Sequence, residues 1–224
     1  MYIGRIMHTD LITIPPEASL ARAQALMDEH TIEHLLVTDE NNKLVGILSD
    51  RDLKQYWASP ATSLSAHELN YLLDKVTVDM IMIRTVVTVT PSTTIERAAY
   101  IMHQYRISSL PVMEEENLVG IITGVDVLEI LFRAIGISED SVRLGVFVKD
   151  SIGQLAKVTG VLKDAGVNIQ SLLCWPEKDY PGITQMVFRV AAAESDKAIR
   201  ALNENGLQAT TRYEKDITPF LPKD

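Results

Sequence analysis

The sequence predicts a chain of mixed α/β (α+β) class, built from a duplicated unit and a smaller C-terminal domain. Two observations predict this organisation. The segment Leu44–Leu53 recurs as Leu118–Val127, with the same glycine and the same alternation of apolar and polar residues. The net charge is −10 over residues 1–140 and +1 over residues 141–224. The duplication indicates a repeated structural unit, and the step in charge indicates a domain boundary near residue 140.

The repeat extends well upstream of these two segments. Met7 aligns with Met82 at an offset of 75 positions, and the offset falls to 74 in the later part of the repeat. Each copy opens with a run of β-branched residues that ends at a proline, at 11–14 in the first copy and at 86–89 in the second. Such a run predicts a short strand at the start of each copy.

A helix, two strands and a second helix follow in each copy. The first helix has apolar residues at i, i+3 and i+4 spacing, and Ser19 and Thr94 are its predicted N-caps. Two apolar runs around a polar turn then predict a pair of strands. Each copy therefore reads β-α-β-β-α, and we expect the copies at 1–58 and 80–136 with a helical insert at 59–79.

The C-terminal domain has a different order of elements. Its apolar runs and helical periodicity predict β-α-β-β-α-β over residues 142–215, followed by a tail at 216–224. Gly166 and Gly206 are the predicted residues after its two helices, where a left-handed backbone conformation is common. This order is that of the ferredoxin-like split βαβ arrangement.

Composition excludes several classes of function. An acidic chain with no stripe of Lys and Arg is a poor binder of nucleic acid, because binding requires clustered positive charge. The most apolar stretch, 118–132, is too short and too polar to span a membrane. The single cysteine, Cys174, cannot form an internal disulfide, which favours the reducing cytoplasm, and we expect it to be a buried, inert thiol.

The sequence also lacks the patterns of common catalytic and metal sites. There is no phosphate-binding Gly-rich loop ending in Lys-Ser/Thr, no nucleophile elbow and no Cys-x-x-Cys. The five histidines are scattered without the spacing of metal ligands, at positions 8, 30, 34, 67 and 103. We therefore predict that the protein is not an enzyme and holds no metal of its own. An enzyme acting on nucleotides or acetoin would need a nucleophile or base cluster that the sequence does not contain.

Each repeat ends in a hydroxyl and a carboxylate three residues apart, Ser49 with Asp52 and Thr123 with Asp126. A carboxylate at this position can accept both hydroxyls of a ribose, and the Ser or Thr can donate to a phosphate or ribose oxygen. The alternative is a purely local role, in which the hydroxyl caps a helix and the aspartate stabilises its first turn. The spacing alone fits both interpretations.

The two pairs differ in the residues between the hydroxyl and the carboxylate. The first pair has Arg51, which can hold a phosphate through two hydrogen bonds. The second pair has Gly124 and Val125 at the corresponding positions and so lacks this cation, although the glycine leaves room for a nucleoside. Three other arginines are candidates to replace the missing cation: Arg84, Arg106 and Arg133.

Two families are recognisable at this point. The runs Gly46–Asp52 and Gly120–Asp126 resemble the strongest motif of CBS (cystathionine β-synthase type) domains, here present as a tandem pair. The C-terminal domain resembles an ACT domain through Asp150–Leu155 and Gly166–Ile169. A CBS pair followed by an ACT domain is similar in order to the acetoin-utilisation AcuB-type proteins. The resemblance implies a regulatory protein that binds ligands and performs no catalysis.

The CBS resemblance implies a nucleotide site in at least one of the clefts between the repeats, and the unlike residues His34 and Ser109 indicate that the two clefts differ in ligand or occupancy. The expected ligand is AMP, ADP, ATP or another adenosine derivative, with Mg²⁺ as a companion of a polyphosphate. The resemblance assigns the base-binding residues in two groups, each taking one cleft. The first group is Ile3, Ile6, Met7 and His34, and the second is Ile81, Met82, Ser109 and Pro111. For each apolar member, plain core packing is the alternative.

The ACT resemblance implies a second effector, an amino acid, held by the turn after the first strand and by a nearby asparagine. Asn168 can donate to a carboxylate and accept from an ammonium group. The implied residues are Asp150, Ile152, Gly153, Asn168 and Ile169. Alternatively, the glycines only satisfy turn geometry and the domain serves only for dimerisation. In either case the resemblance implies a homodimer. The function implied is a cytoplasmic metabolite sensor that controls a partner enzyme, and the alternative is an interaction scaffold without a ligand.

Overall fold

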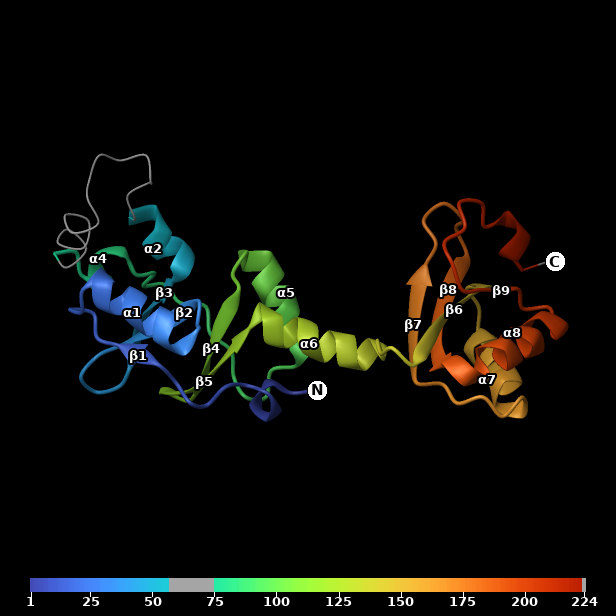
Figure 1. Ribbon diagram of the computed structural model, residues 1–224, viewed down its shortest axis with the longest axis horizontal. Coiled ribbons are helices and arrows are strands. Elements are labelled where there is room, and N and C mark those ends of the chain that lie inside the picture. The colour runs from blue at the N-terminus through green and yellow to red at the C-terminus, as the bar shows by residue number, and fades with distance from the viewer. Residues whose placement is uncertain (57–74, 223–224) are drawn as a thin grey trace. The chain divides into compact units, whose positions relative to one another are not determined.

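The computed structural model describes residues 1–56 and 75–222 and divides into two compact units, Met1–Leu128 and Glu129–Asp224. Figure 1 labels strands β1 to β5 in the first unit and β6 to β9 in the second. The insert expected between the repeats lies outside the described residues up to position 74. Mixed α and β structure is present in both units, as the sequence predicts.

The first repeat follows the predicted order of elements. Its sheet has the order β1-β2-β3, in which β1 runs parallel to β2 and β2 runs antiparallel to β3. Helix α1 packs its buried face on this sheet, and α2 begins directly where β3 ends. The elements are β1 (Thr13–Ile14), α1 (Leu20–His30), β2 (His34–Thr38), β3 (Leu44–Ser49) and α2 (Asp50–Tyr56).

The second repeat has the same helices and hairpin but a shorter first strand. The strand expected at 86–89 is reduced to one bridge between Val89 and Val112, because only Val89 reaches the edge of the hairpin. Strands β4 and β5 pair antiparallel, with a register shift at the same relative place as in the first repeat. The elements are α5 (Ile95–Tyr105), β4 (Ser109–Glu114), β5 (Asn117–Thr123) and α6 (Gly124–Ile135).

The ends of the two equivalent helices show the duplication at atomic detail. The hydroxyls of Ser19 and Thr94 each accept a hydrogen bond of 3.2 Å from the backbone N–H three residues later. At the other ends, Thr31 and Arg106 both adopt the left-handed conformation, with φ of 54° and 55°. The predicted N-caps are therefore confirmed, and the repeats share their backbone geometry.

The two repeats exchange the segments that lead into them. The 3-10 helix η1 (Ile3–Arg5) precedes the first repeat, yet the backbone N–H of Ile3 donates to Thr93 O in the second repeat, at 2.9 Å. The short helix α4 (Val78–Ile81) precedes the second repeat, yet Val78 is buried in the core of the first. Each lead-in segment therefore completes the other repeat, which joins the pair into one unit.

In each repeat, the exchanged lead-in segment packs a methionine side chain against a buried glycine. A Cβ atom on Gly46 would lie 2.5 Å from Met82 Sδ, and a Cβ atom on Gly120 would lie 2.5 Å from Met7 Sδ. Both glycines are buried at the middle of the second strand of a hairpin. The repeated glycine is therefore required because a side chain from the other repeat occupies the space above it.

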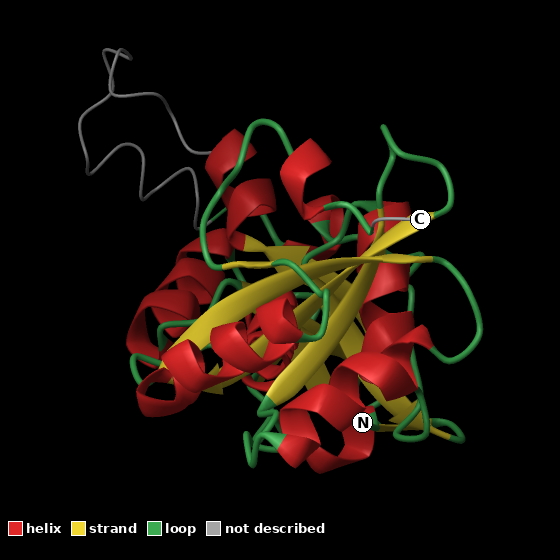
Figure 2. Ribbon diagram, turned by 90° about the vertical axis from the view of Figure 1, so that its right-hand side faces the viewer, coloured by secondary structure: helices red, strands yellow, loops and turns green. Residues whose placement is uncertain are grey.

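The second unit has the predicted ferredoxin-like sheet, with helices α7 and α8 packed on it (Figure 2). The strand order is β7-β8-β6-β9, and every pair is antiparallel. Gly166 and Gly206 follow the two helices at φ of 62° and 74°, as predicted. The elements are β6 (Ser141–Lys149), α7 (Gln154–Asp164), β7 (Ser171–Pro176), β8 (Ile183–Ala191), η2 (Ala192–Glu194), α8 (Ser195–Glu204), β9 (Ala209–Thr210) and η3 (Thr218–Phe220).

One prediction for this unit is wrong. Cys174 is exposed, whereas the sequence predicted a buried thiol. It lies on β7, which is an edge strand of the sheet, and the neighbouring Trp175 is 62% exposed. An apolar run in sequence does not distinguish an edge strand from a central one, and this is why the burial of the thiol was mispredicted.

Candidate functional site

A cleft of about 440 Å³ opens in the first unit where the two repeats meet. Its volume falls in the range of small-molecule sites. The first repeat supplies the ends of β2 and β3 and the start of α2, and the second supplies its lead-in segment and the start of β4. The lining residues are Glu33, His34, Ile47, Ser49, Asp50, Arg51, Asp52, Lys54, Ile83, Thr85, Val86, Val87, Arg106, Ile107, Ser108, Ser109 and Pro111.

Ser49 and Asp52 form a reciprocal cap at the start of α2 on the wall of this cleft. Asp52 Oδ2 accepts hydrogen bonds from the Ser49 hydroxyl at 2.5 Å and from the Ser49 backbone N–H at 2.9 Å. Local capping is therefore part of the role of this pair, as one of the two interpretations expects. The second carboxylate oxygen, Asp52 Oδ1, has no hydrogen-bond partner among the residues described and remains available to a ligand.

The charges on the cleft wall are mixed. Lys54 is paired with Asp50 at 2.5 Å, and this hydrogen bond raises the pKa of the lysine. Arg51 and Arg106 also line the cleft, and neither side chain has an ion-pair partner within the part of the chain that the structure describes. Two guanidinium groups are therefore available to an anionic ligand in a wall that also carries carboxylates.

His34 is the titratable group that the cleft perturbs. It pairs with Ser49 in the β2–β3 register, so the strand pairing fixes its place beside the cap. Its Nε2 lies 2.9 Å from the Ser108 hydroxyl of the second repeat. Burial lowers the pKa of His34 and outweighs the nearby carboxylates, so the ring is neutral at pH 7. A neutral ring and a hydroxyl suit the polar edge of a base.

The structure groups the predicted site residues differently from the sequence. Six of them line this one cleft: Ser49, Arg51, Asp52, His34, Ser109 and Pro111. His34 was grouped with Ile3, Ile6 and Met7, and this grouping is wrong, because His34 lies with Ser109 and Pro111 instead. The physical reason is that the two repeats pack against each other at this point, where His34 Nε2 lies 2.9 Å from the hydroxyl of Ser108, the neighbour of Ser109.

The remaining apolar candidates lie in or beside the cores. Met82 is 7% exposed and belongs, with Ile81 packed against it, to the core cluster of the first repeat. Ile3 is fully buried, and Ile6 and Met7 are partly buried. Sequence reasoning missed Ile83 and the run 85–87 as lining residues. The repeat offset aligns Ile83 with His8, which was not a predicted site residue either, and no local pattern marks the run 85–87.

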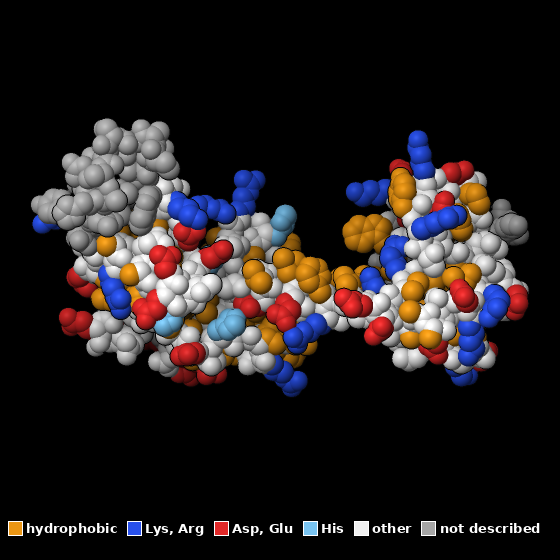
Figure 3. All heavy atoms as spheres, in the orientation of Figure 1, with side chains coloured by type: hydrophobic (Ala, Val, Ile, Leu, Met, Phe, Trp, Pro, Cys, Tyr) orange, Lys and Arg blue, Asp and Glu red, His pale blue; other side chains and the backbone are white. Residues whose placement is uncertain are grey.

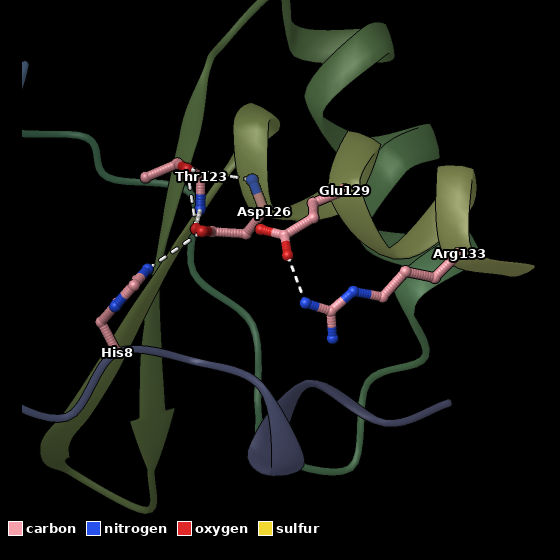
Figure 4. A network of polar contacts seen from close by, with 5 residues as sticks. All are labelled: His8, Thr123, Asp126, Glu129 and Arg133. Carbon is pink, nitrogen blue, oxygen red and sulfur yellow. Dashed lines mark hydrogen bonds and ion pairs between the residues drawn. The ribbon is translucent and has the colours of Figure 1, made fainter. Parts of the chain in front are cut away.

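The second hydroxyl–carboxylate pair has the same geometry with one addition (Figure 4). Asp126 Oδ2 accepts from the Thr123 hydroxyl at 2.7 Å and from the Thr123 backbone N–H at 2.8 Å. Its other oxygen, Oδ1, lies 2.9 Å from Nε2 of His8. Both oxygens of this carboxylate are therefore engaged. None of the three arginines named as candidates to supply a cation at the second pair is available there. Arg133 forms an ion pair with Glu129, and Arg84 forms one with Asp79. Arg106 lines the first cleft instead.

The hydrogen bonds to Asp126 have a consequence for stability. Burial by itself raises the pKa of Asp126, but the hydrogen bonds from Thr123 and His8 outweigh it, and the pKa is lowered overall. A carboxyl whose pKa is lower when folded stabilises the fold above its unfolded pKa of about 4. That contribution is lost as the pH falls through the lower, folded-state pKa.

We expect Asp126→Asn to make the free energy of unfolding less dependent on pH in the acid range. The variant should be less stable than the wild type at pH 6, and the difference should shrink as the pH falls below 4. Urea unfolding at a series of pH values measures this. Asp10→Asn is the control, because Asp10 is exposed and has no hydrogen-bond partner in the described part of the chain. Equal acid dependence of wild type and Asp126→Asn would contradict the prediction.

The predicted effector residues of the second unit are not gathered into one site. Asn168 and Ile169 line a shallow groove of about 520 Å³ with residues of α7, including Thr159 and Lys163. The other three predicted residues, Asp150, Ile152 and Gly153, are exposed in the turn before α7 and do not line this groove. The backbone N–H of Asn168 donates to the Glu194 carboxylate at 3.3 Å.

Within residues 1–56 and 75–222, no three His, Cys, Asp or Glu side chains are grouped so that they could hold a metal ion. Across the same ranges, no helix combines the length and the apolar character needed to cross a membrane.

Comparison with known proteins matches both units to family models. The model of the CBS domain matches residues 3–59 and 78–133, and the model of the ACT domain matches residues 142–206. Inosine-5′-monophosphate dehydrogenase of Staphylococcus aureus is 28% identical over 202 residues, which cover 82% of this chain and 38% of the enzyme. The chain spans 31% to 38% of the length of the curated relatives that it matches.

Solved structures match the first unit. A CBS-domain protein of Agrobacterium tumefaciens is 26% identical, with a TM-score of 0.51 over 58% of this chain and 99% of that one. A Vibrio cholerae protein described as an acetoin utilization protein (AcuB) is 30% identical, with a TM-score of 0.49 over 59% and 90%. A CBS domain pair in complex with 5′-methylthioadenosine and S-adenosyl-L-methionine is 27% identical, with a TM-score of 0.49 over 58% and 95%.

Proposed function

This chain belongs to the CBS-domain family and carries an ACT domain after its CBS pair, and from that premise we propose that it is a regulatory protein that senses an adenosine-containing ligand. One observation carries the proposal. Within the described residues, the first cleft presents a carboxylate oxygen without a hydrogen-bond partner, Asp52 Oδ1, beside two guanidinium groups without an ion-pair partner. The carboxylate oxygen can accept hydrogen bonds from ribose hydroxyls, and the guanidinium groups can bind a phosphate.

The wall of the cleft divides into three regions that match the parts of a nucleotide. Asp52 takes the ribose hydroxyls. Arg51 and Arg106 take the phosphate, and Ile47, Ile83 and the neutral His34 enclose the base. Because carboxylates also line the cleft, a ligand with one phosphate fits it better than a polyphosphate alone. ADP and ATP would bring Mg²⁺ to offset the additional charge.

The second unit adds an effector to the proposal, and helix α6 adds an assembly surface. Asn168 and its groove take an amino acid, as ACT domains do. A homodimer is supported by the exposed apolar side chains on α6, where Val125, Leu128 and Phe132 are each more than half exposed and hydrophobic atoms gather in Figure 3. The output is control of a partner enzyme in the cytoplasm. The domain order points to an enzyme of acetoin utilisation.

A ligand panel tests the sensing function. The melting temperature of the purified chain is measured with AMP, ADP, ATP and S-adenosylmethionine, each with and without Mg²⁺, and with the common amino acids. A ligand at 100 times its Kd stabilises the folded state by about 2.7 kcal/mol, which raises the melting temperature by several degrees. A shift with adenosine ligands supports the proposal. No shift with any compound would favour an interaction scaffold instead.

A further inference from the structure

At one equivalent position of the lead-in segments, the two hydroxyl–carboxylate pairs face different side chains. His8 and Ile83 are equivalent, and each is held on the opposite repeat by two backbone hydrogen bonds. His8 N donates to Ile121 O at 2.9 Å, and Ile121 N donates back at 3.0 Å. Ile83 N donates to Ile47 O at 2.9 Å, and Ile47 N donates back at 3.0 Å. The backbone is therefore the same in both places, and only the side chain differs.

This side chain decides whether a carboxylate oxygen is available. At the second pair, His8 Nε2 occupies Asp126 Oδ1 at 2.9 Å, and Thr123 occupies the other oxygen. At the first pair, isoleucine cannot form such a bond, and Asp52 Oδ1 has no partner within the described residues. A ribose that approached Asp126 would have to displace the histidine, whereas one that approached Asp52 would displace only water.

We propose that His8 closes the second CBS site, so that the chain binds one adenosine ligand per CBS pair, in the first cleft. The inference rests on the proposed sensing function and adds its stoichiometry and the residue that sets it. The charges agree with it, because the second pair has Gly124 and Val125 where the first has Arg51. His8 is 61% exposed, so its side chain can be exchanged at little cost to the core.

A reciprocal exchange of the two side chains tests this. In a calorimetric titration with AMP and, separately, with adenosine, the wild type should bind one equivalent. His8→Ile should bind two equivalents of adenosine, because it frees Asp126 at a site that lacks a phosphate-binding arginine. Ile83→His should bind none or bind at least tenfold more weakly, because the new histidine can reach Asp52. His103→Ile, a change of an exposed histidine on α5, is the matched control and should bind like the wild type.

A further variant identifies the second site. Adding Asp126→Asn to His8→Ile should return the stoichiometry to one. Two equivalents bound by the wild type, or one equivalent bound by His8→Ile, would overturn the inference and leave the sensing function intact. No binding of either probe by the wild type or by any variant would overturn the sensing function and the inference together.

Discussion

Asp52→Asn should weaken the binding of an adenosine ligand to the first cleft by about 10- to 100-fold. A hydrogen bond to a charged acceptor contributes about 1.5–3 kcal/mol, and the two ribose hydroxyls would share the unengaged oxygen of this carboxylate. The amide presents an NH₂ group or a weaker, neutral oxygen to the same hydroxyls. Isothermal titration with AMP measures the loss directly.

The matched control is Asp126→Asn, the same change at the equivalent position of the second repeat. We expect it to leave the AMP affinity unchanged, because the wild-type carboxylate is already occupied by Thr123 and His8. Asp52 also caps α2, so the free energy of unfolding must be measured for both variants. A loss of stability of about 1 kcal/mol would be the capping contribution. Unchanged affinity in Asp52→Asn would show that the ligand does not use this carboxylate.

Gly46→Ala should destabilise the CBS pair by about 1–3 kcal/mol, and Gly46→Val by more. The added Cβ atom would lie 2.5 Å from Met82 Sδ and 3.3 Å from the backbone oxygen of Ile83, and the side chain of Met82 is itself only 7% exposed. Overpacking of a well-filled interior typically has a cost of this size. Urea unfolding followed by circular dichroism gives the change, and Gly120→Ala should behave alike.

Gly124→Ala serves as the control for this steric argument. Its Cβ atom would meet only Ser108 O, at an ordinary contact distance of 3.7 Å, at the start of a helix where alanine is favourable. A double-mutant cycle makes the test specific. Met82→Ala makes room for the new methyl group, so the combined change should be less destabilising than the sum of the single changes. If the effects of the two changes were additive, the destabilisation by Gly46→Ala would not arise from contact with Met82.

The elements of this fold could be predicted because their signals are local. Periodicity, prolines and polar turns predict the helices and hairpins, and Ser19 and Thr94 mark the helix starts where the structure has them. The prediction of a strand at 86–89 was wrong because β-branched residues indicate an extended backbone, whereas a ladder also requires that the segment lie along a partner strand, and only Val89 does so. The burial of Cys174 was mispredicted for a related reason, since the exposure of its thiol depends on the position of β7 in the sheet.

The first cleft could be predicted only in part. The cap residues and Arg51 are near one another in sequence, so a motif finds them. The grouping of His34 with Ser109 and Pro111 depends on how two repeats pack, and no spacing within one repeat encodes it. The bond between His8 and Asp126 joins residues 118 positions apart. The different environments of the two carboxylates become visible only after the repeats are aligned, when His8 and Ile83 fall at equivalent positions.

The exchange of lead-in segments means that each repeat taken by itself would lack part of its core and of its backbone pairing. Residues 2–8, which complete the second repeat, are synthesised first. They can pair only after strand β5 is present, because His8 forms its bridge with Ile121 of that strand. The first repeat likewise lacks Val78 and Met82 of its core until the second has begun. Closing such long loops slows folding and makes it cooperative. The two CBS repeats should therefore unfold in one transition. Neither repeat can be deleted without loss of part of the other.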